Sequence, residues 1–126
     1  MVTKYRSKKV YVYADGYTEL RNDLKAHGPI IKTFDSQKEY RRYGELILLL
    51  KAGKITDLKR QVKFELTPNQ YINGELVERA SNYIADFTYI ENGELVVEDV
   101  KGMRTDLYKL KRKMLLHLYG IRVKEV

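Results

Sequence analysis

The 126-residue chain contains no cysteine and no long hydrophobic run. Without cysteine it has neither disulfides nor thiolate metal sites, a composition that is compatible with a reducing compartment. Its longest apolar run, Leu46–Leu50, is far shorter than the roughly 20 residues of a membrane-spanning helix. Residues 1–9 (MVTKYRSKK) also lack the apolar region of a signal peptide. We therefore expect a cytoplasmic protein with no membrane partner.

Histidine is scarce, and sequence repeats are absent. The two histidines, His27 and His117, are too far apart in the predicted topology to form a metal site or a general-base pair. No internal repeat, low-complexity tract or linker divides the chain. Hydrophobic residues make up 44% and charged residues 33%, as in an ordinary soluble domain. We expect a single domain over residues 1–126, with a basic N-terminal arm at residues 1–9.

The net charge of +7 is unevenly distributed. Residues 1–13 carry four basic and no acidic side chains, and residues 101–126 carry eight basic and two acidic ones. The two ends therefore sum to +10, and residues 14–100 to −3. Basic ends can attract the phosphates of a nucleic acid, and the clustered carboxylates of the centre can bind a metal ion that acts on them. The simpler alternative is that Lys and Arg only keep a small domain soluble.

A strong hairpin signal lies in the stretch YIADFTYIENGELVVEDVKG. Asn92-Gly93 suits a type I′ turn, because both residues tolerate the positive φ that this turn requires, and β-branched and aromatic residues flank it. A two-residue loop fixes the register, which places Asp86 directly opposite Asp99. Side chains alternate along a strand, so Asp86, Asp99 and Lys101 are predicted to share one face.

Two directly opposed carboxylates repel each other unless a cation lies between them. Mg²⁺ commonly binds one or two carboxylates together with water and phosphate oxygens. Asp86 and Asp99 are therefore candidate ligands of Mg²⁺ or Mn²⁺, and Lys101 points at the same pocket. The alternative is that Asp99 and Lys101 form a surface ion pair on a solvated strand. The apolar residues around them favour an interior strand and hence a site.

A helix is predicted over Ser36–Ala52, with Gly53 at its end. Ser36 and Glu39 form a capping box at its start. At 100° per residue, Glu39 lies on the apolar face of the helix, whereas Glu45 points toward water. Glu39 is therefore a candidate third ligand, although the capping box alone also explains a glutamate at this position.

Further elements follow from patterning and turn residues. They are a strand at Val10–Tyr13, a short helix over Thr18–Ala26, a strand at Gln61–Leu66 ended by Pro68, a small hairpin at Tyr71–Val77 around Asn73-Gly74, a helix over Asp106–Tyr119 between Thr105 and Gly120, and a strand over Ile121–Val126. The last strand, helix and strand predict a crossover that joins parallel strands. We therefore expect an α/β fold with helices packed on a mixed sheet.

The last predicted helix has two faces. Its buried side is predicted to be the leucine stripe, which we define as Leu107, Leu110, Met114 and Leu118. Its outer face carries Lys109, Arg112 and Lys113. These basic residues are candidate phosphate contacts, and the alternative is an ordinary solvated helix face.

These features together resemble the PD-(D/E)xK nuclease superfamily. A phage-associated family of uncharacterised proteins placed in that superfamily is similar over KYRSKK, FDSQKEYRRYGEL, QVKFEL, YIADFTY, LVVEDVKG and YKLKRKML. The likeness covers nearly the whole chain except about residues 14–32, which we expect to be an insertion. The chain departs from the name motif in having Ala85, rather than Pro, before Asp86.

The resemblance implies a restriction-endonuclease-like core with the element order αβββαβ. By position, Asp86 matches the first strand carboxylate of the superfamily, and Asp99 and Lys101 match its (D/E)-x-K. Glu39 matches its helical glutamate. Gln61 lies where related enzymes often carry a glutamine near the site.

The resemblance also implies a Mg²⁺- or Mn²⁺-dependent DNA endonuclease, acting on branched or recombination intermediates of a phage in the host cytoplasm. We expect DNA as the partner, a homodimer, and contacts with other phage replication or recombination proteins. The predicted DNA-binding residues are Lys8, Lys9, Lys109, Arg112 and Lys113. Two alternatives remain open, a non-catalytic DNA-binding or architectural protein, and a scaffold for other replication proteins.

Overall fold

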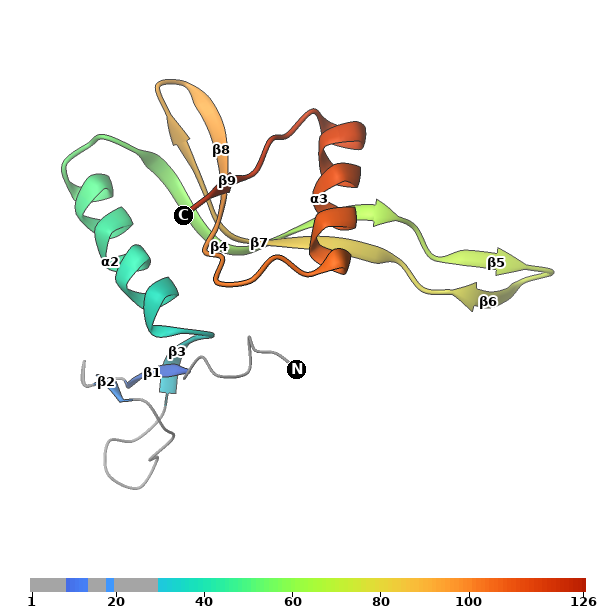
Figure 1. Ribbon diagram of the computed structural model, residues 1–126, viewed down its shortest axis with the longest axis horizontal. Helices are drawn as coiled ribbons and strands as arrows, with labels where there is room; N and C mark the ends of the chain where they lie inside the picture. The colour runs from blue at the N-terminus through green and yellow to red at the C-terminus, as the bar shows by residue number, and fades with distance from the viewer. Residues whose placement is uncertain (1–8, 14–17, 20–29) are drawn as a thin grey trace. The chain divides into compact units, whose positions relative to one another are not determined.

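The computed structural model describes residues 9–13, 18–19 and 30–126, and Figure 1 gives their arrangement. The chain is mixed α/β, with a mixed central sheet and, in these ranges, two helices. Its contacts divide it into two units, residues 1–49 and 50–126. In the described ranges no helix is long and apolar enough to cross a membrane.

The first unit contains an antiparallel sheet of three strands in the order β2-β1-β3. These strands are β1 (Val10–Tyr13), β2 (Thr18–Glu19) and β3 (Ile30–Phe34). The strand at Val10–Tyr13 is confirmed, whereas the predicted helix over Thr18–Ala26 is wrong at its start, because Thr18–Glu19 is extended and pairs with β1. The remainder of that prediction, residues 20–26, lies outside the described residues. Strand β3 was not predicted, although its run Ile-Ile-Lys-Thr-Phe is rich in strand formers.

Helix α2 (Gln37–Lys51) is confirmed, one residue shorter at each end than the predicted Ser36–Ala52. The Ser36 Oγ accepts a hydrogen bond from the Glu39 N–H at 3.0 Å, which caps the first turn. Gly53 closes the helix with φ of 74°, a left-handed conformation that glycine adopts without a steric penalty. Leu46 is fully buried, and Glu45 is exposed as predicted.

The second unit is built on a four-stranded sheet in the order β4-β7-β8-β9. Its strands are β4 (Thr56–Thr67), β7 (Ser81–Glu91), β8 (Glu94–Asp99) and β9 (Lys124–Glu125). The first two pairings are antiparallel and the last is parallel, as the predicted crossover requires. Strand β9 is shorter than the predicted Ile121–Val126, and β4 is longer than the predicted Gln61–Leu66.

The turn between β7 and β8 has the predicted form. Asn92 and Gly93 have φ of 53° and 77°, as a type I′ turn requires. The predicted register is confirmed from the residues beside the turn to the pair of Phe87 and Glu98. The next step along the two strands brings Asp86 to Asp99.

A second, smaller hairpin joins β4 to β7. It consists of β5 (Gln70–Ile72) and β6 (Glu75–Glu78), around a turn in which Asn73 and Gly74 also have positive φ. This confirms the predicted hairpin. In Figure 1 it extends from the ends of β4 and β7 away from α3.

Helix α3 (Asp106–Tyr119) packs on β4 and β7 and closes the core of the second unit. Thr105 caps its start and Gly120, with φ of 69°, ends it, both as predicted. The buried core residues are Leu66, Tyr83, Ala85, Val97 and Leu115. Partly buried Tyr108 and Met114 pack against them from α3.

The predicted orientation of α3 is wrong. In the leucine stripe only Met114 is partly buried, while Leu107, Leu110 and Leu118 are at least half exposed. The face that turns inward instead carries Tyr108, Arg112 and Leu115, spaced four and three residues apart on one side of the helix. Arg112, predicted to lie on the outer face, therefore points toward the sheet.

Candidate functional site

Asp86 and Asp99, which we call the aspartate pair, are linked by hydrogen bonds between β7 and the end of β8. The Asp99 Oδ1 accepts a hydrogen bond from the Asp86 N–H at 3.0 Å. The Asp86 Oδ2 accepts one from the Val100 N–H at 2.9 Å. Each carboxylate thus takes the place of a ladder carbonyl for the opposing backbone. These two hydrogen bonds hold the aspartate pair in place just beyond the last paired residues of β7 and β8.

Asp99 is the buried member of the pair. Only 1% of its surface is exposed, and its Oδ2 accepts a hydrogen bond from the Tyr83 hydroxyl. The Lys101 Nζ lies 3.8 Å from the same oxygen. Burial raises the pKa of Asp99 above its ordinary value of 3.8, against the lowering effects of the Lys101 charge and of the Asp86 N–H. A buried carboxylate of this kind gains from a neighbouring cation.

Gln61 lies beside the other member of the pair. The pairs that flank it in β4 and β7 place it opposite Asp86, and its Nε2 is 3.5 Å from the Asp86 Oδ1. Its φ of 52° is in the left-handed region, which costs a residue with a side chain about 1–2 kcal/mol. Such strain persists where the surroundings over-determine a conformation, and it is found often at functional sites.

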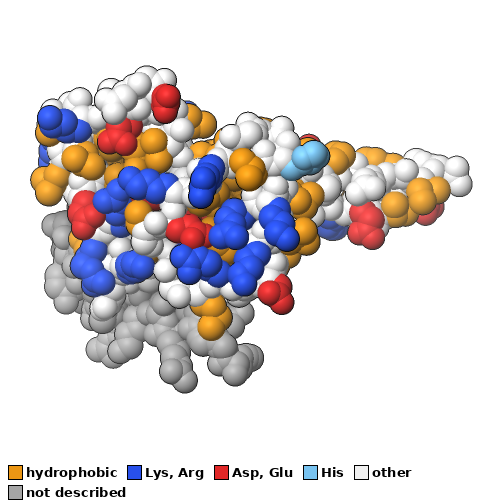
Figure 2. Space-filling model, turned by 45° about the horizontal axis from the view of Figure 1, so that its top comes forward, with side chains coloured by type: hydrophobic (Ala, Val, Ile, Leu, Met, Phe, Trp, Pro, Cys, Tyr) orange, Lys and Arg blue, Asp and Glu red, His pale blue; other side chains and the backbone are white. Residues whose placement is uncertain are grey.

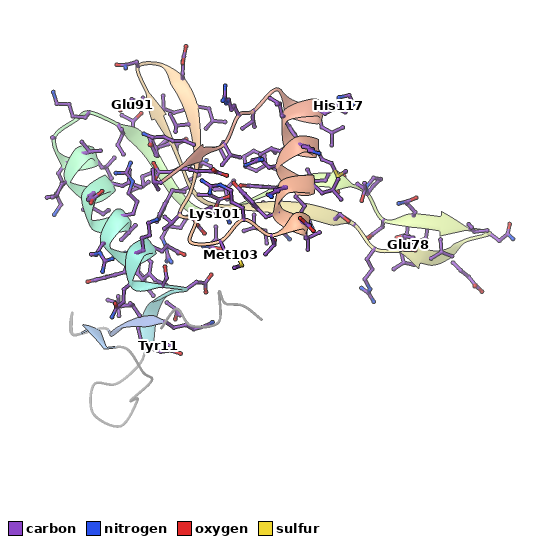
Figure 3. The ribbon with its side chains drawn as sticks, in the orientation of Figure 1. Tyr11, Glu78, Glu91, Lys101, Met103 and His117 are labelled. Carbon is purple, nitrogen blue, oxygen red and sulfur yellow. The ribbon has the colours of Figure 1, made fainter. Side chains whose placement is uncertain are left out.

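Lys101 lies in the segment that leads from β8 to α3, close to that helix (Figure 3). Its Nζ is 4.2 Å from the centre of the Tyr108 ring, and 23% of its side chain is exposed. Its backbone N–H donates to the Val126 carbonyl, and the Val126 N–H donates to the Asp99 carbonyl. The backbone around Lys101 is therefore fixed to the chain that follows β9.

A third carboxylate, Glu125, was not predicted from the sequence. It pairs with Asp99 in the parallel ladder and binds three side chains, with Arg104 Nε at 2.7 Å, the Tyr108 hydroxyl at 2.5 Å and Arg112 Nη1 at 2.9 Å. We call these four residues the Glu125 cluster. The Tyr108 hydrogen bond, followed by those of the arginines, lowers the pKa of Glu125 from 4.5 to about 2. Burial and the bond to Glu125 raise the pKa of Tyr108.

Two signals point to the Glu125 cluster once α3 and β9 are placed. Tyr108 and Arg112 are four residues apart and so share a helix face. Strand β9 runs parallel to β8, and in this pair Glu125 lies beside Asp99. The register of that parallel pair cannot be counted from the sequence as in a hairpin, because a long crossover, and not a tight turn, joins the two strands.

The carboxylate next to Asp99 in the chain serves another purpose. Glu98 is fully buried, and its Oε1 accepts a hydrogen bond from the Tyr89 hydroxyl at 2.8 Å. Neighbouring residues of a strand point to opposite faces. Asp99, and not Glu98, therefore faces Lys101.

The other predicted site residues lie apart from this group in the chain. Glu39 is buried on α2 in the first unit, whereas the aspartate pair, Gln61 and Lys101 belong to the second unit. Lys8 lies outside the described residues, and the exposed Lys9 Nζ is 3.7 Å from the Asp35 Oδ1.

Of the basic residues predicted for the outer face of α3, Lys109 and Lys113 are exposed, whereas Arg112 belongs to the Glu125 cluster. Figure 2 shows Lys and Arg side chains gathered over the region of α3, with acidic side chains among them. The basic face that was predicted for α3 is therefore present, without Arg112 on its outer side.

Comparisons with known proteins give a family for this arrangement. The family model described as "Protein of unknown function (DUF1064)" matches residues 2–124. The chain belongs to the DUF1064 family. No curated protein and no solved structure matches it.

In this DUF1064 chain, the donor set of the aspartate pair fits a hard divalent cation. Each carboxylate oxygen carries two lone pairs, so oxygens that accept a hydrogen bond can also bind a metal. Among the described residues, no three His, Cys, Asp or Glu side chains form a cage for a metal ion. Mg²⁺ rarely needs such a cage, because it keeps several waters and binds one or two carboxylates. The two aspartates are the residues that would hold it.

Proposed function

We propose that this DUF1064 protein is a metal-dependent DNA endonuclease of the PD-(D/E)xK type, with a restriction-endonuclease-like core. The observation that carries the proposal is the aspartate pair with Lys101 3.8 Å from its buried member. Two carboxylates and one lysine at the end of a hairpin are a group that metal-assisted phosphodiester hydrolysis can use.

In this proposal each residue has a defined task. Asp86 and Asp99 would hold the metal ion, and the expectation from the sequence that Glu39 is a further ligand stays a prediction. When bound, Mg²⁺ or Mn²⁺ supports negative charge on the phosphate and activates a water molecule. Lys101 positions the attacking water or stabilises the charge that develops on the phosphate in the transition state. Gln61 keeps Asp86 oriented through its side-chain amide.

The proposed substrate is branched or recombination-intermediate DNA of a phage. The exposed Lys109 and Lys113 bind the phosphate backbone without reading its sequence. A homodimer would place two sites on two strands.

The deciding experiment compares the wild type with Lys101→Ala on four DNA forms. Supercoiled, linear, single-stranded and four-way branched DNA are incubated with Mg²⁺, Mn²⁺ or EDTA. We expect metal-dependent cleavage by the wild type, and a loss of roughly 10²-fold or more in Lys101→Ala, as for other electrostatic catalytic groups. DNA binding should stay nearly unchanged, because one charge among 24 basic residues contributes little to overall attraction.

Lys54→Ala is the matched control, since it removes the same charge from an exposed loop. It should leave both binding and cleavage unchanged. A wild type that binds branched DNA tightly but cuts none of the four forms with either metal would contradict the proposal. That result would favour the non-catalytic DNA-binding protein.

Metal binding can be measured independently of cleavage. Mg²⁺ or Mn²⁺ should raise the melting temperature of the wild type, by an amount that corresponds to about 2.7 kcal/mol when the metal is at 100 times its Kd. Asp99→Asn should abolish this shift, because the amide keeps an acceptor for Tyr83 and loses the charge. Glu45→Gln, which removes an exposed carboxylate of α2, should retain it. Equal shifts in all three proteins would place the ion elsewhere.

A further inference from the structure

The Lys101 ammonium group lies between a carboxylate and an aromatic ring. On one side the Asp99 Oδ2 is at 3.8 Å, and on the other the centre of the Tyr108 ring is at 4.2 Å. A cation at this distance from a tyrosine ring is attracted by the negative face of its π system. The ring therefore limits where the flexible lysine side chain can go.

Tyr108 is held by a hydrogen bond at its hydroxyl and by another at its backbone N–H. Its hydroxyl donates to the Glu125 Oε2 at 2.5 Å, and its backbone N–H donates to the Thr105 Oγ1 at 3.1 Å. Glu125 cannot swing away easily, because Arg104 and Arg112 bind the same carboxylate. The Tyr83 ring, whose hydroxyl binds Asp99, lies 6.2 Å from the Tyr108 ring.

The orientation of α3 shows that this arrangement competes with apolar burial. The leucine stripe remains largely exposed, while the helix turns Tyr108 and Arg112 inward. Burying leucine side chains would remove more apolar surface from water. The observed orientation leaves these leucines exposed and gains the charge-assisted hydrogen bonds of the Glu125 cluster instead.

We propose that Tyr108 is a positioning residue that holds the Lys101 ammonium beside the aspartate pair, and that Glu125 fixes the Tyr108 ring for this task. The inference rests on the proposed function, in which Lys101 acts on the phosphate or on the attacking water. Small displacements of such a group lower the rate strongly without weakening substrate binding. Tyr108 itself touches neither metal nor substrate.

The geometry has a spectroscopic signature that does not depend on cleavage. Protons above an aromatic ring are shifted upfield, so the Lys101 ε-methylene signal should be shifted in protein with isotope-labelled lysine. Lys101→Ala identifies this signal by its loss. The signal of Lys32, whose Nζ donates a hydrogen bond to the Tyr43 hydroxyl at 2.8 Å, is an internal reference that should be unchanged in every variant.

Three substitutions separate the ring from its anchor. Tyr108→Leu removes the ring and should return the Lys101 signal to the position of an ordinary lysine. Tyr108→Phe keeps the ring and loses the hydroxyl, and should retain a reduced shift. Glu125→Gln keeps an acceptor for the hydroxyl and should also retain a reduced shift. An unchanged signal in Tyr108→Leu would overturn the proposal.

Cleavage of four-way branched DNA with Mg²⁺ then tests the role of this contact. In Tyr108→Leu we expect kcat to fall about tenfold or more, with KM and the Kd for DNA within twofold of the wild type. Tyr108→Phe should stay within about threefold of wild-type kcat. Melting temperatures identify any variant that is merely unstable. If Tyr108→Leu is one, the Lys101 signal in Tyr108→Phe and Glu125→Gln decides, and an unreduced shift in both would overturn the role of Glu125 in fixing the ring.

The outcomes distinguish the two proposals. If Tyr108→Leu loses the Lys101 shift but cleaves at the wild-type rate, the positioning role is wrong and the nuclease function stands. If the wild type cleaves no DNA, the proposed function fails, and the Lys101 signal alone decides whether Tyr108 holds this side chain.

Discussion

At the scale of single residues, the site contains two carboxylates whose pKa values are shifted in opposite directions. Asp99 is buried, and burial raises its pKa, so its ionised form is costly without a cation. Glu125 is surrounded by donors that lower its pKa to about 2, so its ionised form is favoured. Tyr108 and Lys101 join the two. Asp99 therefore suits metal binding, whereas Glu125 suits a fixed structural contact.

The lowered pKa of Glu125 predicts how acid affects stability. A carboxylate with a lower pKa in the folded protein stabilises the fold above its unfolded pKa, here 4.5, and this contribution is lost as pH falls toward about 2. In EDTA, the free energy of unfolding of the wild type should therefore fall more steeply between these pH values than that of Glu125→Gln. The difference in slope should approach one proton, or about 1.4 kcal/mol per pH unit.

Urea unfolding at several pH values measures this difference. Asp99, whose raised pKa acts in the opposite direction, is present in both proteins, and its contribution largely cancels because burial, and not the Glu125 charge, is the main cause of that raised pKa. Glu45→Gln serves as the control, because Glu45 is exposed. Parallel profiles for the wild type and Glu125→Gln would contradict the assigned role of the Glu125 cluster.

At the scale of elements, local signals predicted much of the fold. The turns at Asn92-Gly93 and Asn73-Gly74 fixed two hairpins, because few residues tolerate positive φ there. Thr105 and Gly120 marked the ends of α3 correctly. The aspartate pair followed from the first turn by counting residues. These features depend only on neighbours in sequence.

The orientation of α3 could not be predicted in the same way. The helix carries two stripes with helical spacing, the leucine stripe and the stripe of Tyr108, Arg112 and Leu115. Hydrophobicity alone favours the leucine stripe. The second stripe faces inward because Glu125 on β9 supplies partners for Tyr108 and Arg112, and that contact is distant in sequence. The two-residue β2 and β9 likewise depend on their neighbours rather than on a pattern of their own.

The β7–β8 turn gives a prediction about stability at this scale. Gly93 has φ of 77°, and an L-residue in this conformation costs about 1–2 kcal/mol. Gly93→Ala should therefore lower the free energy of unfolding by roughly that amount in urea, with an unchanged m-value. Gly102→Ala is the control, since its added Cβ meets no atom within 4 Å and its φ is not among the positive ones. It should be neutral or slightly stabilising, and equal losses in both variants would contradict the argument.

At the scale of the whole molecule, the second unit holds most of the proposed site. Asp86, Asp99 and Lys101 come from the β7–β8 hairpin and the segment after it, and α3 and β9 supply their support. The predicted Glu39 contribution comes from the first unit and stays a prediction. The excess of basic residues near the end of the chain directly follows Asp86 and Asp99 in sequence. Such a distribution suits a phosphate backbone as partner.

The charge distribution leads to a prediction about DNA binding. If phosphate contacts dominate, log affinity should fall linearly with log salt concentration, and different sequences of the same DNA form should bind about equally. Replacing both Lys109 and Lys113 by Ala should flatten this slope by roughly one unit for each lost phosphate contact. Fluorescence anisotropy in EDTA, over a series of salt concentrations, separates this effect from cleavage.

The matched control removes two exposed lysines from elsewhere, Lys51 and Lys54, and so keeps the same net charge as the test variant. If only the overall charge mattered, both double variants would flatten the slope equally, and the surface of α3 would lose its special role. We expect the larger change for Lys109 and Lys113, because they lie on the helix whose inner face supports Lys101. Sequence-selective binding with little dependence on salt would contradict a backbone-binding surface altogether.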